Sequence, residues 1–592
     1  MADEDGSGHQ ETSVPYDIIA CMIFAFMSSC LFFPNNDYIP LDRRTASVIA
    51  GTLCYVTRNF FFPNNKLNVE EAVDFDVLLL LAAIMCINYI VVNQKETLAV
   101  VEYVQNQIRD KPKNGFWLVA FSAFLASPFL TNDGVCLLFV EPILNAFSEI
   151  INESEEETKK KEEEDVDFNA NNDFKLDKKD ALYFLLGLAC SSNIGSALTY
   201  TGNPQNMIVS QDAVGVMPPY LFLAYMLLPS LSAWLITLLW IQRCWMRMRG
   251  DLSNERRERS SHFKQISGNP MIDSQSGHSV STEMDEKTIE MATVDTERAL
   301  MLQEAINDRR KRYKKKPLDL VIFNKKSTDG EEFGMSSMEP KKQTMLKKVA
   351  KIIVSPFPYA MMMIMAIMIA LIFIDIMSIA GLVCMTAVVM TVILVLGNHW
   401  QGLPIFGGHE DAPPLTAEEK KMNTSLFFDE LFDSIDYSLL LIFLGTFIVV
   451  ENMDSTGLPK KLWNSIVGDT PFDTFASVFG ISVFIIVSSQ FLGNVAVIQL
   501  AKPNVAELED DEKRYAWAII SFVATVGGNL TITGSAANII VAEKASRIDP
   551  NSSVDFFKHA KVCFFVTLFS VVMGALMITA VVMVDNNLRE SW

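Results

Sequence analysis

The chain has 592 residues, of which 50% are hydrophobic, and its mean hydropathy is +0.23. Several apolar runs approach the ~20 residues that a helix needs to cross a bilayer, which excludes a soluble globular protein. The formal net charge of −21 comes largely from loops and tails, and no feature of the sequence favours nucleic-acid binding. The composition predicts an all-α polytopic membrane protein that contacts the lipid bilayer.

The nine cysteines lie within or at the ends of apolar runs, and none forms a CxxC pair. This distribution indicates neither a zinc site nor a disulfide framework, and we expect no cofactor. Residues 1–15 are acidic and polar, without the basic segment of a signal peptide, so the first membrane helix is expected to remain in the mature protein.

In the first half, a hydrophobic segment over 116–147 is interrupted by SPFLTNDG. Non-helical backbone at membrane depth must line a cavity or be buried in protein, so we expect a re-entrant hairpin with its tip at Thr131, Asn132 and Asp133. Residues 149–180 form a charged, solvated insertion on the cytoplasmic side. Ahead of the hairpin, helices are predicted at about 16–33, 44–62 and 73–93, followed by a mixed stretch over 94–114.

The segment 189–210, ACSSNIGSALTYTGNPQNMIVS, begins as an apolar helix and then collects glycines, a proline, hydroxyls and amides. An interrupted hydrophobic segment with a counterpart in the other half of the chain is typical of a transporter binding site. A long helix is predicted over 219–245. Residues 246–350 are predicted to be a cytoplasmic disordered linker, with one helical-looking piece at 297–316.

The pattern then restarts. A second hairpin is predicted over 471–502 and a second interrupted helix over 515–543. The remaining helices of this half are predicted near 356–376, 378–397, 435–452 and 556–584.

These two halves are internal repeats, because their motifs keep order and spacing. VDFDVLLLLAAIM from Val73 aligns with IDYSLLLIFLGTF from Ile435 at an offset of 362 residues, and Asn132 aligns with Asn494 at the same offset. Thr201-Gly202 aligns with Thr533-Gly534 at an offset of 332. The offset falls by 30 because the charged insertion is present only in the first copy.

Each copy is counted as about five transmembrane helices plus one re-entrant hairpin and one broken helix, an odd number of crossings. The predicted fold is therefore two inverted-topology repeats, residues 16–245 and 351–584, with an extracytoplasmic tail at 1–15 and a C-terminal tail at 585–592. Lys and Arg collect on the cytoplasmic side of membranes, so the basic linker is placed inside. Most other basic residues then also fall inside; the main exceptions are Lys460, Lys461, Lys502, Lys513 and Arg514.

Three stretches carry a family resemblance: FLTNDGVCLLFVEPIL, SSNIGSALTYTGNPQN and GGNLTITGSAANIIVAEKA. With DYSLLLIFLGTFIVVENMDSTGLPKKLW they resemble the arsenite-permease branch of the ion transporter superfamily, most of all its plant-type silicon efflux transporters. The resemblance covers about 34–245 and 435–584, and leaves the insertion and the linker outside.

The resemblance implies two inverted repeats that each supply a hairpin tip and a broken helix to a midplane site. It also implies efflux of uncharged silicic or arsenous acid in exchange for protons. The second hairpin tip departs from the family pattern S-N-V-P, since it reads Gly493-Asn494-Val495-Ala496. This departure bears on substrate identity more than on fold.

A small neutral oxyacid needs hydrogen-bond donors and acceptors together, which amides and hydroxyls supply. The two hairpin tips and the two helix breaks carry no basic residue, which disfavours a dicarboxylate substrate, although helix dipoles alone can bind anions. The candidate substrate-binding residues are Thr131, Asn132, Thr201, Gly202, Asn203, Asn206, Asn494, Thr533, Gly534, Ser535 and Asn538.

Asp133 is the only acidic residue in the two hairpin tips and the two helix breaks, and an ionisable residue at membrane depth is a functional hypothesis by default. It is a candidate proton carrier or part of a cation site; the alternative is an acid that caps the second hairpin helix. Glu141, about two turns further on, either faces the cavity or has a structural role. Asp74, Asp76 and Asp436 begin helices, where acids suit the helix dipole, and a structural role is expected.

The leading hypothesis is a secondary active transporter that exports silicic acid or a related metalloid hydroxide, such as arsenite, by proton antiport. The alternative is a sodium/proton antiporter or an anion carrier of the dicarboxylate type on the same scaffold. A third hypothesis is a membrane scaffold that recruits partners through the linker, but a scaffold has no need of matched polar interruptions. An enzyme is not expected, because no nucleophile–base pair, phosphate loop or metal cluster is present.

The plasma membrane is the expected location, with an intracellular vesicle membrane as the alternative, and a homodimer is a further expectation.

Overall fold

The computed structural model describes residues 14–32, 40–62, 65–163, 176, 178–267, 356–374, 378–401, 416–466, 475–548 and 554–590. The chain divides into one compact unit made of residues 1–251 and 352–592 and a second unit made of residues 252–351. Regular structure in the described residues is entirely helical, and five of the helical segments there are long and apolar enough to cross a membrane. The all-α polytopic membrane fold is therefore confirmed.

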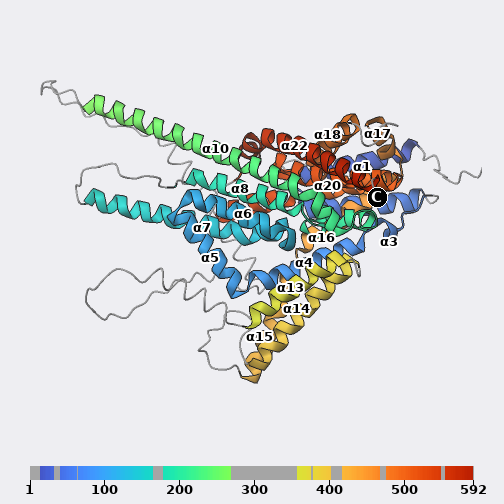
Figure 1. Ribbon diagram of the computed structural model, residues 1–592, viewed down its shortest axis with the longest axis horizontal. Coiled ribbons are helices and arrows are strands. Elements are labelled where there is room, and N and C mark those ends of the chain that lie inside the picture. Colours follow the sequence, from blue (N-terminus) through green and yellow to red (C-terminus); the bar gives the residue numbers. More distant parts are fainter. Residues whose placement is uncertain are drawn as a thin grey trace, which may run out of the picture. The chain divides into compact units, whose positions relative to one another are not determined.

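The first half of the chain contains a hairpin, α6–α7, followed by a helix that breaks and resumes as α8, η3 and α9 (Figure 1). Its elements are α1 (Val14–Phe32), α2 (Arg43–Val56), the π-helical η1 (Thr57–Phe61), α3 (Val69–Ala72), α4 (Phe75–Val92), α5 (Lys95–Asp110), α6 (Pro112–Leu130), α7 (Asn132–Glu163), η2 (Lys178–Asp180), α8 (Ala181–Ser196), η3 (Tyr200–Gly202), α9 (Pro204–Ala213) and α10 (Pro219–Ser267).

The second half repeats this order with a hairpin, α18–α19, and a broken helix made of α20, η4, η5 and α21. Its elements are α13 (Pro356–Ile374), α14 (Ile379–Gln401), α15 (Ala417–Asp433), α16 (Tyr437–Asp454), α17 (Leu458–Ile466), α18 (Phe475–Leu492), α19 (Asn494–Ala506), α20 (Asp510–Gly527), η4 (Gly528–Leu530), η5 (Ile532–Gly534), α21 (Ala536–Ile548) and α22 (Phe556–Glu590).

The two copies agree down to individual caps. Asp74 Oδ1 accepts a hydrogen bond from the Val77 amide at 3.1 Å before α4, and Asp436 Oδ1 accepts one from the Leu439 amide at 3.0 Å before α16. The two capping residues have nearly the same backbone angles, φ −78° and ψ 85° against φ −77° and ψ 82°. The structural role expected for these two acids is confirmed, because each satisfies an amide that the first turn of a helix leaves unpaired.

The copies interlock rather than lie apart. Helix α2 of the first copy packs against α16 of the second, and α14 of the second packs against α4 of the first (Figure 1). The hairpins exchange in the same way, since α7 packs against α21 and α19 packs against α9. Each broken helix therefore ends beside the hairpin of the other copy.

Small residues allow the closest of these contacts. A Cβ added at Gly445 of α16 would collide with the carbonyl oxygen of Ser47, and one added at Gly51 of α2 would lie 3.3 Å from the Gly445 Cα. Ala50 and Cys54 continue this buried stripe along α2. Lipid tails are as apolar as Leu, so close backbone packing rather than the hydrophobic effect holds such helix pairs together in a membrane.

Two segments predicted to be irregular are helical. Helix α7 runs on to Glu163, well into the charged insertion, and α10 runs on to Ser267, past the start of the predicted linker. In the first case three Glu residues stand four positions before three Lys residues, at Glu155–Lys159, Glu156–Lys160 and Glu157–Lys161, a spacing that stabilises helices. The prediction treated charge density as disorder and overlooked this spacing; the piece at 297–316 lies outside the described residues.

Two amphipathic helices were also absent from the prediction. The mixed stretch after α4 is α5, which buries Val101, Val104 and Ile108 at helical spacing. The stretch before α16 contains α15, whose start is fixed by a capping box between Thr416 and Glu419.

Candidate functional site

The two hairpins reverse direction at single residues with positive φ, Thr131 and Gly493, which confirms the predicted position of the first tip. At the first tip the Thr131 hydroxyl accepts a hydrogen bond from the Gly134 amide at 3.3 Å. The Asn88 side chain of α4 donates to the Leu130 carbonyl at 2.7 Å just before the tip. The tip is thus stabilised by one hydrogen bond within the hairpin, to its own threonine hydroxyl, and by another from the buried Asn88 amide of α4.

The breaks in α8–α9 and α20–α21 share one design. In the first break the Asn206 Nδ2 donates to the carbonyl oxygens of Ser196 and Thr199, at 3.3 and 3.0 Å. In the second break the Asn538 Nδ2 donates to the carbonyl oxygens of Gly528 and Thr531, at 2.9 and 3.0 Å. These bonds satisfy the carbonyl groups that a helix leaves unpaired where it ends inside a membrane protein.

The hydroxyls of the breaks tie them to the hairpins. Thr199 and Thr201 both donate to the Pro128 carbonyl of α6, at 2.8 and 3.2 Å. Their counterparts bind Gln490 of α18, which stands in the second copy where Pro128 stands in the first. Thr531 donates to Gln490 Oε1 at 2.7 Å and Thr533 to its carbonyl oxygen at 3.4 Å.

Asn193 of α8 joins the two copies at the centre. Its Oδ1 accepts hydrogen bonds from Asn132 Nδ2 at 2.9 Å and from the Ser535 hydroxyl at 2.8 Å. Its Nδ2 donates to Asn529 Oδ1 at 2.7 Å and to Asn538 Oδ1 at 3.1 Å. One buried side chain therefore links the first hairpin tip to the second broken helix.

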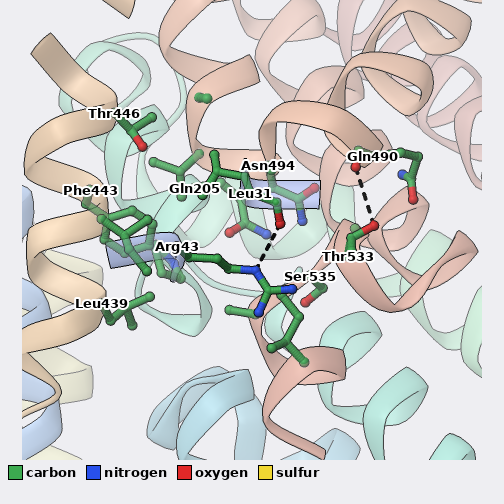
Figure 2. Close-up of a pocket in the computed structure, with 18 of the residues that line it drawn as sticks. Leu31, Arg43, Gln205, Leu439, Phe443, Thr446, Gln490, Asn494, Thr533 and Ser535 are labelled. Atoms are coloured by element: carbon green, nitrogen blue, oxygen red, sulfur yellow. Dashed lines mark hydrogen bonds between the residues drawn. The ribbon is translucent and has the colours of Figure 1, made fainter. Parts of the chain in front are cut away.

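A cavity of about 120 Å³, here called cavity A, lies between these elements and helices α2 and α16 (Figure 2). Both copies supply polar groups to its wall, alongside apolar side chains such as Leu439 and Phe443. The polar lining residues are Arg43, Asn132, Gln205, Thr446, Gln490, Asn494, Thr533 and Ser535.

Two acceptor atoms in this wall are unpaired. Asn132 Oδ1 and Asn494 Oδ1 are buried and accept no hydrogen bond from any described residue. Buried carbonyl oxygens of side-chain amides are normally paired, with protein or with water, because an unpaired one costs about 1–3 kcal/mol. Two residues that line cavity A thus carry buried acceptor atoms without a hydrogen-bond donor among the described residues.

Arg43 is a basic residue in this wall. Figure 2 shows its side chain extended across cavity A, from the side of Leu439 and Phe443 toward Ser535. Its Nε donates to the Leu31 carbonyl at 2.9 Å, and its Nη1 lies 3.3 Å from Glu543 Oε1 of α21. The hairpin tips and helix breaks contain no basic residue, but the fold brings in one from the start of α2, 88 residues before Thr131.

Five of the eleven candidate substrate-binding residues line cavity A: Asn132, Asn494, Thr533, Gly534 and Ser535. The other six lie around it and make the bonds that shape the tips and breaks: Thr131, Thr201, Gly202, Asn203, Asn206 and Asn538. Substrate contact by any of the eleven stays a prediction. The sequence-based selection omitted Arg43, Gln205, Thr446 and Gln490. Gln205 stood inside GNPQN, Thr446 inside DYSLLLIFLGTF and Gln490 just before the second tip, whereas Arg43 stood in no motif.

Asp133 lies in the first turn of α7, and its Oδ1 is buried without a hydrogen-bond partner among the described residues. The capping alternative is therefore not supported by a bond to this oxygen, because the Thr131 hydroxyl serves the Gly134 amide. Asp133 is not among the residues that line cavity A. Glu141 is not among them either; its Oε2 lies 3.8 Å from Lys544 Nζ.

Residues 41–519 match the family model described as a citrate transporter. The chain belongs to the citrate transporter family. The match covers most of the chain and both hairpins, and it confirms the resemblance drawn from the motifs.

Individual proteins that are similar to this member of the citrate transporter family have more specific names than the family. The chain is 31% identical over 179 residues to a protein named putative transporter arsB from Dictyostelium discoideum, covering 29% of this chain and 30% of that one. It is 34% identical over 132 residues to the silicon efflux transporter LSI3 of Oryza sativa subsp. japonica, covering 22% and 27%. It is 24% identical over 151 residues to a 46 kDa membrane protein of Mycobacterium leprae, covering 24% and 34%. The alignments span at most about a third of these relatives.

Proposed function

We propose that this chain is a secondary active transporter that exports silicic acid, or a related metalloid hydroxide such as arsenite, in exchange for protons. The observation that carries the proposal is cavity A, a small chamber with side-chain amides and hydroxyls from both copies in its wall. The names of two relatives, a silicon efflux transporter and an arsB protein, agree with this substrate class.

The chemistry of the wall suits a neutral hydroxyl cluster. Each hydroxyl of silicic or arsenous acid donates one hydrogen bond and accepts others. Asn132 Oδ1 and Asn494 Oδ1 are unpaired acceptors, and the Thr533 and Ser535 hydroxyls serve as acceptors and donors. A volume of about 120 Å³ lies well below the ~300–1,000 Å³ of pockets for drug-sized ligands, so it favours a solute of few atoms.

Orientation fits loading from the cytoplasm. The positive-inside rule places Arg43 and its neighbour Arg44 on the cytoplasmic side, together with Lys544 and Arg547 of α21. Cavity A, at the start of α2, is then reached from the cytoplasm, the side from which an exporter loads. We take the plasma membrane as the location and Asp133 as the group that carries the exchanged proton.

The test is flux in liposomes that contain the purified protein. Silicic acid, arsenite and citrate are offered separately, with and without an imposed pH gradient. The proposal expects silicic acid or arsenite to move, faster when the gradient drives protons the other way. Movement of citrate without silicic acid or arsenite would falsify it.

A second candidate is an anion carrier of the dicarboxylate type. It is favoured by Arg43 in the wall of cavity A and by the description of the family as citrate transporters. Guanidinium groups bind carboxylates in a bidentate way, which gives this alternative a physical basis. The citrate arm of the flux experiment separates the two candidates, and repeating each arm with a sodium gradient separates both from a sodium/proton antiporter.

A further inference from the structure

A second cavity, here called cavity B, has a volume of about 220 Å³ and lies between the starts of α4 and α14 and the end of α9. Part of its wall corresponds to part of the wall of cavity A. Val77 and Leu80 line cavity B, and the residues 362 positions later, Leu439 and Ile442, line cavity A. The starts of α4 and α16 thus contribute corresponding residues to cavities B and A, whereas the hairpin tips contribute to cavity A alone.

The second broken helix strengthens this match. Met207 of α9 lines cavity B, and Ile539 of α21, 332 positions later, lines cavity A. One helical turn further on, the corresponding residues are Gln211 and Glu543. Residues four positions apart share a helix face, so these two stand on the same side of their helices as the cavity residues before them.

The charge at the two cavities differs. Arg43, the first residue of α2, lines cavity A, whereas Ile379, the first residue of α14, lines cavity B. Arg43 faces Glu543 at 3.3 Å. At cavity B the place of Glu543 is taken by Gln211, which donates to Asp74 at 2.6 Å and accepts from Lys502 at 3.2 Å. The wall of cavity A thus holds a cation at the start of α2, and the wall of cavity B holds an apolar residue at the start of α14.

The pair at cavity A is accessible and weak. The Glu543 side chain is 54% exposed and that of Arg43 is 19% exposed. Ion pairs that reach solvent contribute about 0–1 kcal/mol, so a solute that offers oxygen atoms competes with Glu543 for the guanidinium at little cost. The bond from Arg43 Nε to the Leu31 carbonyl keeps the group in the cavity while its Nη atoms change partners.

We propose that Arg43 is a latch at cavity A, paired with Glu543 while the cavity is empty and transferred to the oxygen atoms of an entering solute. The inference rests on the proposed transport function and deepens it, because it names the group that meets the solute first. Only bonds to oxygen change in this exchange: Arg43 stays protonated, and a hydroxyl or carboxylate oxygen of the solute replaces the carboxylate of Glu543.

The latch predicts opposite changes of KM when Arg43 and Glu543 are substituted separately. The experiment measures initial rates in liposomes over a range of solute concentrations, using whichever of silicic acid, arsenite and citrate the unaltered protein carries. Arg43→Gln is expected to raise KM about tenfold, since a hydrogen bond to a charged group is lost. Glu543→Gln, which installs the residue found at position 211, is expected to lower KM several-fold, because Arg43 is released to the solute. The double variant is expected to match Arg43→Gln.

Controls keep the outcomes separate. Lys460→Gln breaks another solvent-reaching ion pair, with Glu507 at 2.6 Å, between residues that do not line cavity A, and is expected to leave KM unchanged. Arg43→Lys keeps the charge and is expected to recover part of the affinity. If an altered protein fails to reconstitute, solute-induced shifts of its thermal unfolding temperature in detergent replace the flux measurement.

A rise in KM for Glu543→Gln, like that for Arg43→Gln, would overturn the latch, since a structural brace loses function from either side. The proposed function is judged separately, on the unaltered protein. If only citrate moves, the metalloid proposal fails, while the opposite signs of the two KM changes still decide the latch.

Discussion

Thr131 and Gly493, 362 residues apart, share one backbone conformation, φ 60° and ψ 156° against φ 79° and ψ 157°. This region is essentially reserved for glycine, and a β-branched residue there is strained by about 1–3 kcal/mol. Both hairpins thus turn through the same unusual geometry, although only one has the residue best suited to it. The Thr131 hydroxyl offsets part of the strain through its bond to the Gly134 amide.

The first prediction tests the second tip. An added Cβ at Gly493 would meet no atom within 4 Å, so Gly493→Ala changes backbone preference and nothing else. We expect a loss of about 1–3 kcal/mol in the free energy of unfolding, measured as a lower unfolding temperature in detergent. Gly215→Ala is the matched control, because that site is also open and lacks a positive φ; it is expected to be neutral or slightly stabilising.

The second prediction concerns the central amide. Asn193→Ala removes the partner of Asn132 and Ser535 and leaves buried polar groups unpaired, at about 1–3 kcal/mol each. Thermal stability and maximal transport rate are both expected to fall. Thr525 is the corresponding residue of α20 and accepts only two longer bonds, from Asn203 and Gln205 at 3.3 Å. Thr525→Ala should therefore cost less, and an equal loss would contradict a central role for Asn193.

The third prediction concerns the helix breaks. A Cβ at Gly202 would collide with the Ser196 carbonyl oxygen, and one at Gly534 would lie 2.7 Å from the Gly528 carbonyl oxygen. Neither obstacle is a flexible side chain, so Gly202→Ala and Gly534→Ala are expected to abolish transport and to lower folded yield, measured by size-exclusion chromatography of detergent extracts. Normal transport by either variant would show that the breaks are looser than described.

The fourth prediction concerns proton exchange. If Asp133 carries the proton, Asp133→Asn cannot load or release it, and efflux should lose its dependence on an imposed pH gradient. Solute binding, measured by thermal shift, should persist, because Asp133 does not line cavity A. Glu141→Gln is the control, since that carboxylate pairs with Lys544 and is expected to leave the gradient dependence intact. Gradient-driven efflux that survives in Asp133→Asn would refute the carrier role.

The repeat could be predicted because its signals are local. The caps at Asp74 and Asp436 and the tip at Thr131 are short patterns that recur at one offset, and the structure reproduces them at the same residues. The break at Gly202 likewise recurs at Gly534. Covalent spacing along the chain is enough to locate such features.

Cavity A could only be predicted in part, because it is made by elements that meet through folding. Arg43 belongs to no motif and reaches the site only because α2 packs against α16 of the other copy. Gln490 escaped notice because its counterpart is Pro128, a residue with no side-chain hydrogen-bonding group. The helical charged segment at the end of α7 was missed for another reason. Its high charge content predicts disorder, but the i,i+4 spacing of its Glu and Lys residues favours a helix.

The unequal wall residues Arg43 and Ile379 have a consequence for the transport cycle as a whole. A carrier returns to its starting state after each cycle, so its affinities on the two membrane faces are bound by detailed balance to its rates of crossing. A higher affinity for the solute on one membrane face must be matched by a slower conversion of the loaded carrier away from that face. If the proposed carrier loads at cavity A on one face and at cavity B on the other, the charge difference sets the concentrations at which each face saturates, while the direction of net movement belongs to the gradients alone.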